Sequence, residues 1–401
     1  MTNWPILPLR EVGDIAQGIT LGRKTRRADL VPVPYLRVAN VQDGRLDMRE
    51  IKMIKATSGE AEKWRLRAGD LLLTEGGDLD KLGRGTCWQD ELPLCIHQNH
   101  IFRVRLPFER YDPEFVSLQF GSGYGKAYFL THAKKTTGIA TINQRVLGDF
   151  PLLSPPVDQQ RRISTRLKAQ LATVDEARQA AQTQSANAQK LAAAILREAF
   201  EAIADRKTVT IGEVAETCSG TTPSRDRKDY WTPATIPWVK TGEVAFAAIH
   251  RTEEQVSPLA AAECSLPLLP PGTVLVAMYG QGKTRGQSAV LQIEATTNQA
   301  CFAILPNDTF EPEYLQFWLH HSYRSLREDS ADRGGNQSNL NGGMLNAFEV
   351  PLIARETQHA LVKKIKNALA AADSLRSALA TRLSEIERLP AHLLAQVFGN
   401  A

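Results

Sequence analysis

Two long stretches of the chain repeat apolar residues every three or four positions, a spacing that places them on one face of an α-helix. These stretches are residues 158–207 and 355–401. Each apolar stripe is typical of a coiled-coil seam and cannot stay exposed to water, so we expect the two helices to pack as an antiparallel coiled coil. The predicted seam consists of Ile163, Leu167, Leu171, Val174, Leu191, Ile195, Ile365, Leu369, Leu375, Leu379, Leu383 and Ile386.

Prolines bound these predicted helices. Pro155 and Pro156 precede the first stretch and cannot extend a helix backwards. Pro390 lies inside the second stretch, where it is expected to end or kink the helix. An alternative stays open, in which each stripe is the buried face of a core helix in an ordinary domain. The length of each uninterrupted stretch favours paired helices.

The remaining residues mix short apolar runs with glycine, proline and polar segments, a pattern typical of α/β domains. Segments of residues 1–157 recur in residues 208–354 at an offset of about 200 positions. Because the order and the offset are both kept, the pattern predicts a tandem duplication. The matching pairs are LREVGDIAQG with IGEVAETCSG, LRAGDLLLTEGG with LPPGTVLVAMYG, HIFRVRL with ACFAILP, and PEFVSLQF with PEYLQFWL.

The sequence therefore predicts an α+β fold with two α/β globular domains in tandem repeat, separated by two long helices packed as an antiparallel coiled coil. We place the first domain at 1–157, the first helix at 158–207, the second domain at 208–354 and the second helix at 355–401. Divergence between the copies is greatest in 20–65 and 222–268. The two domains are thus expected to share a frame but not a surface.

The net charge of +4 is unevenly distributed along the chain. The first domain holds 22 Lys and Arg against 18 Asp and Glu, whereas the second holds 10 against 16 and is net −6. A nucleic-acid binder usually shows a basic footprint. In this chain any such footprint would have to come from local clusters, above all in the second domain.

Other classes of protein are disfavoured by composition. No run of eighteen apolar residues exists, and the first residues lack the cationic and apolar parts of a secretory signal. The five cysteines are scattered without a C-x-x-C pair, which favours a reducing cytoplasm over a disulfide framework or a zinc site. His97 and His100 have no third ligand nearby, so we expect ordinary polar residues in or beside a strand.

The duplicated closing segments resemble the DNA-specificity subunit of type I restriction–modification systems. They read INQRVLGDFPLLSPPVDQQRRI and NLNGGMLNAFEVPLIARETQHALV. The openings EVGDIAQG and EVAETCSG, and the stretch MYGQGKTRGQSAVLQIEATTNQACFAIL, also resemble the family. Two departures are ARETQ, where the family tends to have two prolines before an acid–Gln pair, and the acidic insertion in TEGGDLDKLGRG.

This resemblance implies a division of labour. Each globular domain would be a target-recognition domain that reads one half of a bipartite, asymmetric target in double-stranded DNA, and the helices would set the gap between the halves. The partners would be two methyltransferase (modification) subunits and a restriction subunit. S-adenosylmethionine, ATP and Mg would be bound by those partners, and this chain would not be an enzyme.

The sequence lacks four residue patterns that are typical of catalytic or cofactor-binding sites. There is no N/D-P-P-[YF], F-x-G-x-G, G-x-S-x-G or H-E-x-x-H. Gly282-Lys283-Thr284 resembles the end of a P-loop, but Ala277 stands where the first glycine is required. Two alternatives nevertheless stay open: a nucleotide-binding enzyme that uses this segment, and a duplicated scaffold protein that binds another macromolecule.

Cationic and amide side chains in the divergent and glycine-rich loops are the candidates for DNA contact, since Arg and Lys suit phosphate and guanine whereas Asn and Gln suit adenine. The opposing interpretation is a solvated face, a plain hairpin turn or a structural cap. In the first domain the candidates are Arg23, Lys24, Arg26, Arg27, Arg37, Asn40, Lys81, Arg84, Lys134, Lys135, Thr136 and Thr137. In the second they are Arg225, Arg227, Lys228, Lys240, Gln281, Lys283, Arg285, Arg333, Asn336, Gln337 and Ser338, where we align Lys240 with Arg37, and Lys283 and Arg285 with Lys81 and Arg84.

Overall fold

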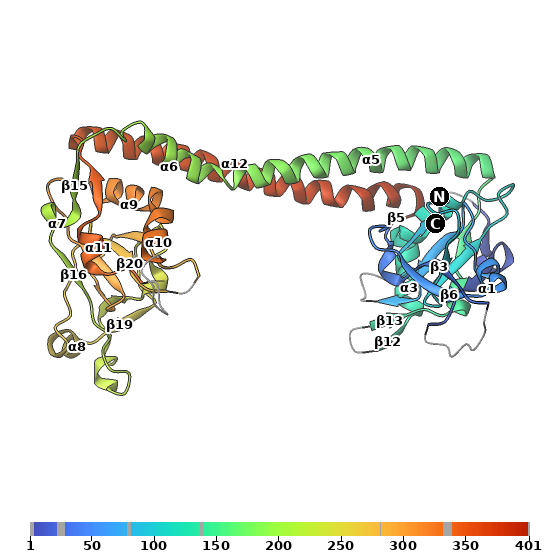
Figure 1. Cartoon of the computed structure of the whole chain (residues 1–401), viewed down its shortest axis with the longest axis horizontal. Helices are drawn as coiled ribbons and strands as arrows, with labels where there is room; N and C mark the ends of the chain where they lie inside the picture. The colour runs from blue at the N-terminus through green and yellow to red at the C-terminus, as the bar shows by residue number, and fades with distance from the viewer. Residues whose placement is uncertain are drawn as a thin grey trace. The chain divides into compact units, whose positions relative to one another are not determined.

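The computed structural model describes residues 4–21, 29–77, 82–136, 139–280, 282–331 and 339–399. The chain divides into two compact units (Figure 1). Unit 1 joins Met1–Gln182 with Thr381–Ala401, and unit 2 is Thr183–Ala380. Each unit therefore consists of one α/β domain, here called a head, and segments of both long helical stretches. The predicted fold class is confirmed, while the predicted domain boundaries stay predictions.

Each head is built on an antiparallel sheet with the same strand order and register. Phe102 pairs with Gln17 and Leu73 in the first head, as Phe302 pairs with Ser219 and Val276 in the second. The first sheet is β2 (Asp14–Gln17), β11 (Ile101–Arg105), β7 (Leu71–Thr74) and β9 (Gly85–Cys87). The second is β16 (Thr217–Ser219), β23 (Cys301–Ile304), β20 (Val274–Ala277) and β21 (Ser288–Leu291), to which β18 (Ala248–Ile249) adds a parallel edge.

A smaller sheet in each head carries the divergent segment. In the first head β3 (Val31–Leu36) lies between β6 (Lys52–Ala56) and β10 (Ile96–His97). In the second head β17 (Ile236–Val239) lies between β19 (Glu254–Val256) and β22 (Thr296–Thr297). Leu36 pairs with His97 as Val239 pairs with Thr297, so the residues that follow these strands, Arg37 and Lys240, are structural counterparts.

Glycine joins the two sheets of each head at one close approach. A Cβ on Gly18 would lie 1.8 Å from the carbonyl oxygen of His97, and one on Gly220 would lie 1.8 Å from that of Thr297. No side chain fits there, which explains the glycine that closes both EVGDIAQG and EVAETCSG.

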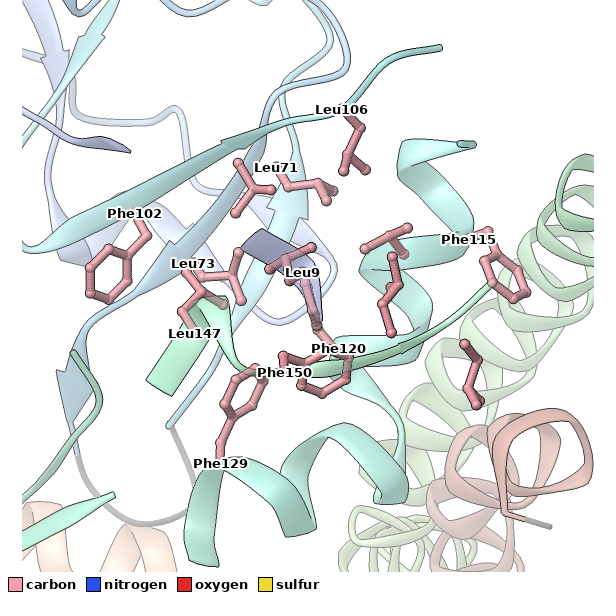
Figure 2. Close-up of a cluster of buried hydrophobic side chains, with 14 of the residues drawn as sticks. Leu9, Leu71, Leu73, Phe102, Leu106, Phe115, Phe120, Phe129, Leu147 and Phe150 are labelled. Atoms are coloured by element: carbon pink, nitrogen blue, oxygen red, sulfur yellow. The ribbon is translucent and has the colours of Figure 1, made fainter. Parts of the chain in front are cut away.

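The core of the first head lies between its sheet and two short helices, α2 (Pro113–Gly121) and α3 (Gly123–His132). Figure 2 shows Phe120, Phe129 and Phe150 grouped beneath the strand residues Leu71 and Leu73. In the second head α9 (Pro312–His321) and α10 (Tyr323–Ala331) take the corresponding places along the chain. Proline occupies the first turn of both α2 and α9.

The long helices are α5 (Val157–Ala188), α6 (Leu191–Glu201) and α12 (Arg355–Phe398). Each helical stretch ends on a buried phenylalanine that enters the core of a head. Phe398 packs on Phe115 with ring centroids 5.3 Å apart, and Phe200 packs on Tyr314 at 5.8 Å. Since Phe398 reaches the first head and α12 begins in unit 2, this one helix belongs to both units.

The covered positions of α12 recur every seven residues. Ile365, Leu379 and Ile386 are buried and Ala372 is half-buried, which is the spacing of a coiled-coil seam. Leu375 was wrongly placed in the seam. The other covered position of each heptad lies four residues after the first, at Leu369 and Leu383. In the heptad that begins at Ala372 this position is Arg376, so Leu375 lies outside the stripe and is 46% exposed.

One further expectation about the helices was wrong. The first stretch is not continuous, since a turn at Gln189 and Lys190 separates α5 from α6. Pro390 lies inside α12 without ending it, since the helix runs on to Phe398, and a kink at Pro390 stays a prediction. Leu196, which was not assigned to the seam, is 1% exposed and belongs to the core of the second head.

A buried glutamine joins each long helix to its head. The Gln160 Oε1 accepts from the N–H of Asp112 at 3.0 Å, and its Nε2 donates to the carbonyls of Pro155 at 2.7 Å and Arg110 at 3.3 Å. Gln358 repeats this arrangement with the N–H of Glu311 at 2.8 Å and with two carbonyls. Both side chains are fully buried.

Replacing Gln160 by Ala is expected to lower the free energy of unfolding by about 1–3 kcal/mol, because it leaves buried backbone groups without partners. Urea denaturation of the full chain measures the effect. Gln170→Ala, an exposed change on the same helix, should stay within about 0.5 kcal/mol of the unsubstituted chain. Equal midpoints for the two variants would show that the buried amide is not an anchor.

Candidate DNA-recognition surfaces

Several predicted contact residues lie outside the described part of the chain. They are Arg23, Lys24, Arg26, Arg27, Lys81, Thr137, Gln281, Arg333, Asn336, Gln337 and Ser338. The described residues on either side fix where these loops begin and end. Residues 22–28 join Leu21, which follows the close approach at Gly18, to β3 of the smaller sheet.

In the first head, described strands beside two separately predicted loops pair with each other. β13 (Ile139–Thr141) pairs with β8 (Gly76–Gly77) and with β12 (Lys134–Thr136). β8, which ends at Gly77, thus lies in the same sheet as β12, which carries the exposed Lys134 and Lys135. The N–H of Ile142 donates to the Glu75 carbonyl at 2.8 Å, as that of Leu340 donates to the Met278 carbonyl at 3.1 Å. The closing segment is thus tied to the glycine-rich segment in both heads.

Asn40 was wrongly predicted to contact DNA. Its side chain is 3% exposed and caps a short 3-10 helix, Val38–Asn40. The Asn40 Oδ1 accepts from the N–H of Arg37 at 2.8 Å, and its Nδ2 donates to the carbonyls of Asp47 and Glu50 at 2.8 and 3.0 Å. Every hydrogen-bonding group of this amide is satisfied inside the head, so none is left for a base edge.

Arg37 and Lys240 are held by carboxylates at corresponding places in the two heads. Arg37 lies 3.1 Å from Glu50, whose pKa it lowers by hydrogen bonding. Lys240 lies 2.6 Å from Glu253 and 3.2 Å from Glu254, and these hydrogen bonds raise the pKa of the lysine. The predicted alignment of Lys240 with Arg37 is confirmed by strand register.

Arg225 and Arg227 are fixed by acidic and aromatic neighbours. Arg225 donates to Glu254 at 2.6 Å and lies 3.7 Å from the centre of the Trp231 ring, a cation–π contact. This aromatic support was not predicted from the sequence.

Arg227 pairs with Asp229 at 2.6 Å and lies 4.2 Å from the centre of the Tyr230 ring. Lys228, between these residues in the chain, is exposed. The acidic residues thus set the geometry of the Arg225–Arg227 loop and offset most of its charge.

Strand register pairs the glycine-rich segments of the two heads differently from the alignment predicted from the sequence. Leu73 pairs with Gly85 as Val276 pairs with Ser288, so Leu82 is the counterpart of Arg285 and Arg84 that of Gln287. The alignment of Lys283 and Arg285 with Lys81 and Arg84 was therefore wrong. Lys283 is exposed, Arg285 is half-buried, and Arg84 donates to Gln42 Oε1 at 3.1 Å.

His97 and His100 do not form a metal pair. His97 is fully buried, its Nδ1 lies 3.0 Å from the carbonyl oxygen of Ile101, and burial lowers its pKa to about 4. His100 instead contacts Glu75 at 2.6 Å. Over the described ranges no group of three or more His, Cys, Asp or Glu could hold a metal ion. Burial also raises the pKa of the Cys95 and Cys301 thiols to about 12, so both stay protonated near neutral pH.

The repeated strand register shows that the chain contains two copies of one α/β domain with different polar loops. Residues 204–386 match the family model of the type I restriction modification DNA specificity domain. Over 173 residues the chain is 32% identical to the type I restriction enzyme MjaIX specificity subunit of Methanocaldococcus jannaschii, covering 42% of this chain and 38% of that relative. Over 169 residues it is 26% identical to the EcoKI specificity subunit of Escherichia coli, covering 42% and 36%. The alignments thus span about two fifths of these relatives.

The fold is shared with solved structures over nearly the whole chain. The HsdS subunit from Thermoanaerobacter tengcongensis superposes with a TM-score of 0.68 and 18% identity, covering 99% of this chain and 97% of that one. A chain from a study of complex assembly in the type I restriction–modification system gives a TM-score of 0.72 at 18% identity, covering 99% and 98%. The predicted resemblance to type I DNA-specificity subunits is confirmed. None of the described helices is both long enough and apolar enough to span a membrane.

Substituting Asn40 by Ala should reduce the free energy of unfolding by about 1–3 kcal/mol, because the buried amide and its three backbone hydrogen bonds are lost. Lys135→Ala, at an exposed position of β12, should change it by less than about 0.5 kcal/mol. Thermal and denaturant unfolding of both variants compare the two roles. A fully stable Asn40→Ala variant would contradict the structural assignment.

Proposed function

We propose that this chain is the sequence-specific DNA-binding subunit of a type I restriction–modification complex and recognises a bipartite, asymmetric target. The observation that carries the proposal is the duplicated head, which repeats strand register and buried contacts in both copies while the exposed loops differ. A frame kept twice with two different surfaces suits two different half-sites. The specificity domain matched over residues 204–386 supports the same assignment.

In this function the chain binds double-stranded DNA and carries two methyltransferase subunits, to which a restriction subunit can be added. S-adenosylmethionine belongs to the methyltransferase, and ATP and Mg to the restriction subunit. The chain itself acts without catalysis, in the cytoplasm. Its contribution is to place polar loops of each head against one half-site, with phosphate contacts that set position and base contacts that set sequence.

A duplicated scaffold for another macromolecule is the competing function. Its support is the second head, where Glu254, Asp229 and Glu253 hold the cations of the divergent segment. The two functions differ in salt dependence, since DNA binding must weaken steeply as salt rises.

The decisive test is co-expression of the chain with a methyltransferase encoded beside it, in a host without DNA methylation, followed by mapping of modified adenines. The expected result is one split, asymmetric motif with a fixed gap. A stable complex that leaves no motif would favour the scaffold function. A chain that binds ATP tightly without partners would favour a nucleotide-binding enzyme.

We infer that the helices fix the gap between the two half-sites. The division between the units crosses α5 between Gln182 and Thr183 and crosses α12 between Ala380 and Thr381. Four residues inserted at both points add about one helical turn, or about 6 Å. The gap should then grow by about two base pairs, at roughly 3.4 Å each, with both half-sites unchanged.

Methylation mapping of this double insertion, beside the unmodified chain, measures the gap directly. Insertion only at Gln182–Thr183 is the matched control, since it lengthens one helix without the other and should impair assembly. An unchanged gap in an active double insertion would refute the role of the helices.

A further inference from the structure

The second head contains a pocket lined mainly by arginine. It lies between the segment that follows β20 and helix α10, and its volume is about 400 Å³. We call it the arginine pocket. Its lining consists of Arg285, Tyr323, Arg324, Arg327 and Glu328. Among the described lining residues, three are arginines and one, Glu328, is acidic.

Arg285 is the least well satisfied member of the pocket. Its side chain is half-buried, and its Nε is buried without a hydrogen-bond partner. Burial and the charge of Arg327 both lower the pKa of Arg285, so the folded protein disfavours its charged form. Within the described residues neither Arg285 nor Arg324 forms an ion pair. An anion is therefore the missing complement.

Hydrogen bonds hold the pocket in shape. The Tyr323 hydroxyl donates to the carbonyl oxygen of Lys283 at 2.6 Å, and Arg327 Nη1 donates to that of Arg285 at 2.9 Å. Gly286, with φ of +85°, lets the chain turn against Tyr323 and Arg327. The glycine-rich segment is thereby joined to α10, and the Arg327 guanidinium is held beside Arg285.

The first head has an apolar contact at the corresponding place. Leu82, the counterpart of Arg285, is 3% exposed and belongs to the hydrophobic core. Gly83, the counterpart of Gly286, packs against the ring of Phe129. A half-buried arginine costs desolvation free energy that a leucine does not. The charged Arg285 therefore destabilises the folded head, and a bound anion would offset this desolvation cost.

We propose that the arginine pocket binds one phosphodiester group of the DNA backbone beside the second half-site, and that the first head has no equivalent clamp. This inference rests on the proposed DNA-binding function. Guanidinium groups are hydrogen-bond donors only and match the paired oxygens of a phosphate. The contact positions the acidic second head on DNA and carries no sequence information.

The test is a methylphosphonate scan, which removes the charge of one phosphate at a time in a duplex bearing the mapped target. The full chain with its methyltransferase subunits is compared with its Arg285→Leu and Arg324→Gln variants. Arg285→Leu restores the residue that the first head carries. Arg251→Gln, an exposed charge removal in the same head outside the pocket, is the matched control.

For the unsubstituted complex, one backbone position beside the second half-site should weaken binding about tenfold when neutralised. Arg285→Leu should bind about tenfold more weakly, lose sensitivity at that position alone, and show a salt slope smaller by about one. Its Tm should equal or exceed that of the unsubstituted chain. Arg324→Gln should reduce the same sensitivity, and Arg251→Gln should keep it.

Three results would overturn the clamp. If the methylphosphonate scan of the Arg285→Leu complex is identical to that of the unsubstituted complex, the pocket does not bind a DNA phosphate, although DNA recognition itself is intact. A lowered Tm with unchanged affinity would show a structural role. Tight binding of inorganic phosphate or Mg-ATP to the DNA-free chain, abolished in Arg285→Leu, would assign the pocket to a free phosphate compound. If the unsubstituted complex has no salt-dependent affinity for any duplex, the proposed function fails, and the clamp with it.

Discussion

The buried amides of Gln160 and Gln358 are the contacts on which the arrangement of each unit depends. Each amide joins three backbone segments: the N-terminus of a short head helix, the turn before that helix, and the turn that leads into a long helix. A fully satisfied amide in a low-dielectric interior resists displacement, because any shift leaves buried polar groups unpaired. Each long helix therefore has one register against the head at its start. At the far end of each helical stretch, Phe200 and Phe398 pack into the core of a head.

This fixed frame explains how the loops could diverge. Gly18 and Gly220 keep the two sheets of each head together, and the divergent segments that follow them contribute to smaller hydrophobic clusters, which include Tyr35 in the first head and Trp238 in the second. In the second head the cations of the divergent segment are oriented by Glu254 and Asp229, which also offset their charge. Net charge therefore describes this head poorly, since the charge that matters for a ligand is the part that lacks an internal partner.

Much of the fold was predictable because it depends on patterns that sequence records directly. Heptad spacing predicted the helices, and ordered repeats at a constant offset predicted the duplication. The wrong predictions concern features that depend on three-dimensional contacts between separated parts of the chain. Asn40 looked like a loop amide because its cap partners, Asp47 and Glu50, are distant in sequence. Pro390 was expected to end or kink α12, and the helix does not end there. The glycine-rich loops were misaligned because glycines and cations can be matched in several ways, and only the pairing of Leu73 and Val276 fixes the register. Arg324 and Arg327 were missed because charged residues on a short helix resemble a solvated face.

Leu82 of the first head and Arg285 of the second occupy the same position of the shared fold but differ in charge. Two copies of one head place the same backbone position against the same helix region, yet one copy fills it with an aliphatic side chain and the other with a guanidinium group. Stability alone favours the aliphatic residue, as the unpartnered Arg285 Nε makes plain. The first head has the exposed Lys134 and Lys135, whereas in the second head Arg225, Arg227 and Lys240 have acidic partners. A head of net negative charge can approach a polyanion only where a cation lacks an acidic partner inside the protein, and Arg285 of the arginine pocket is such a cation in the described part of the second head.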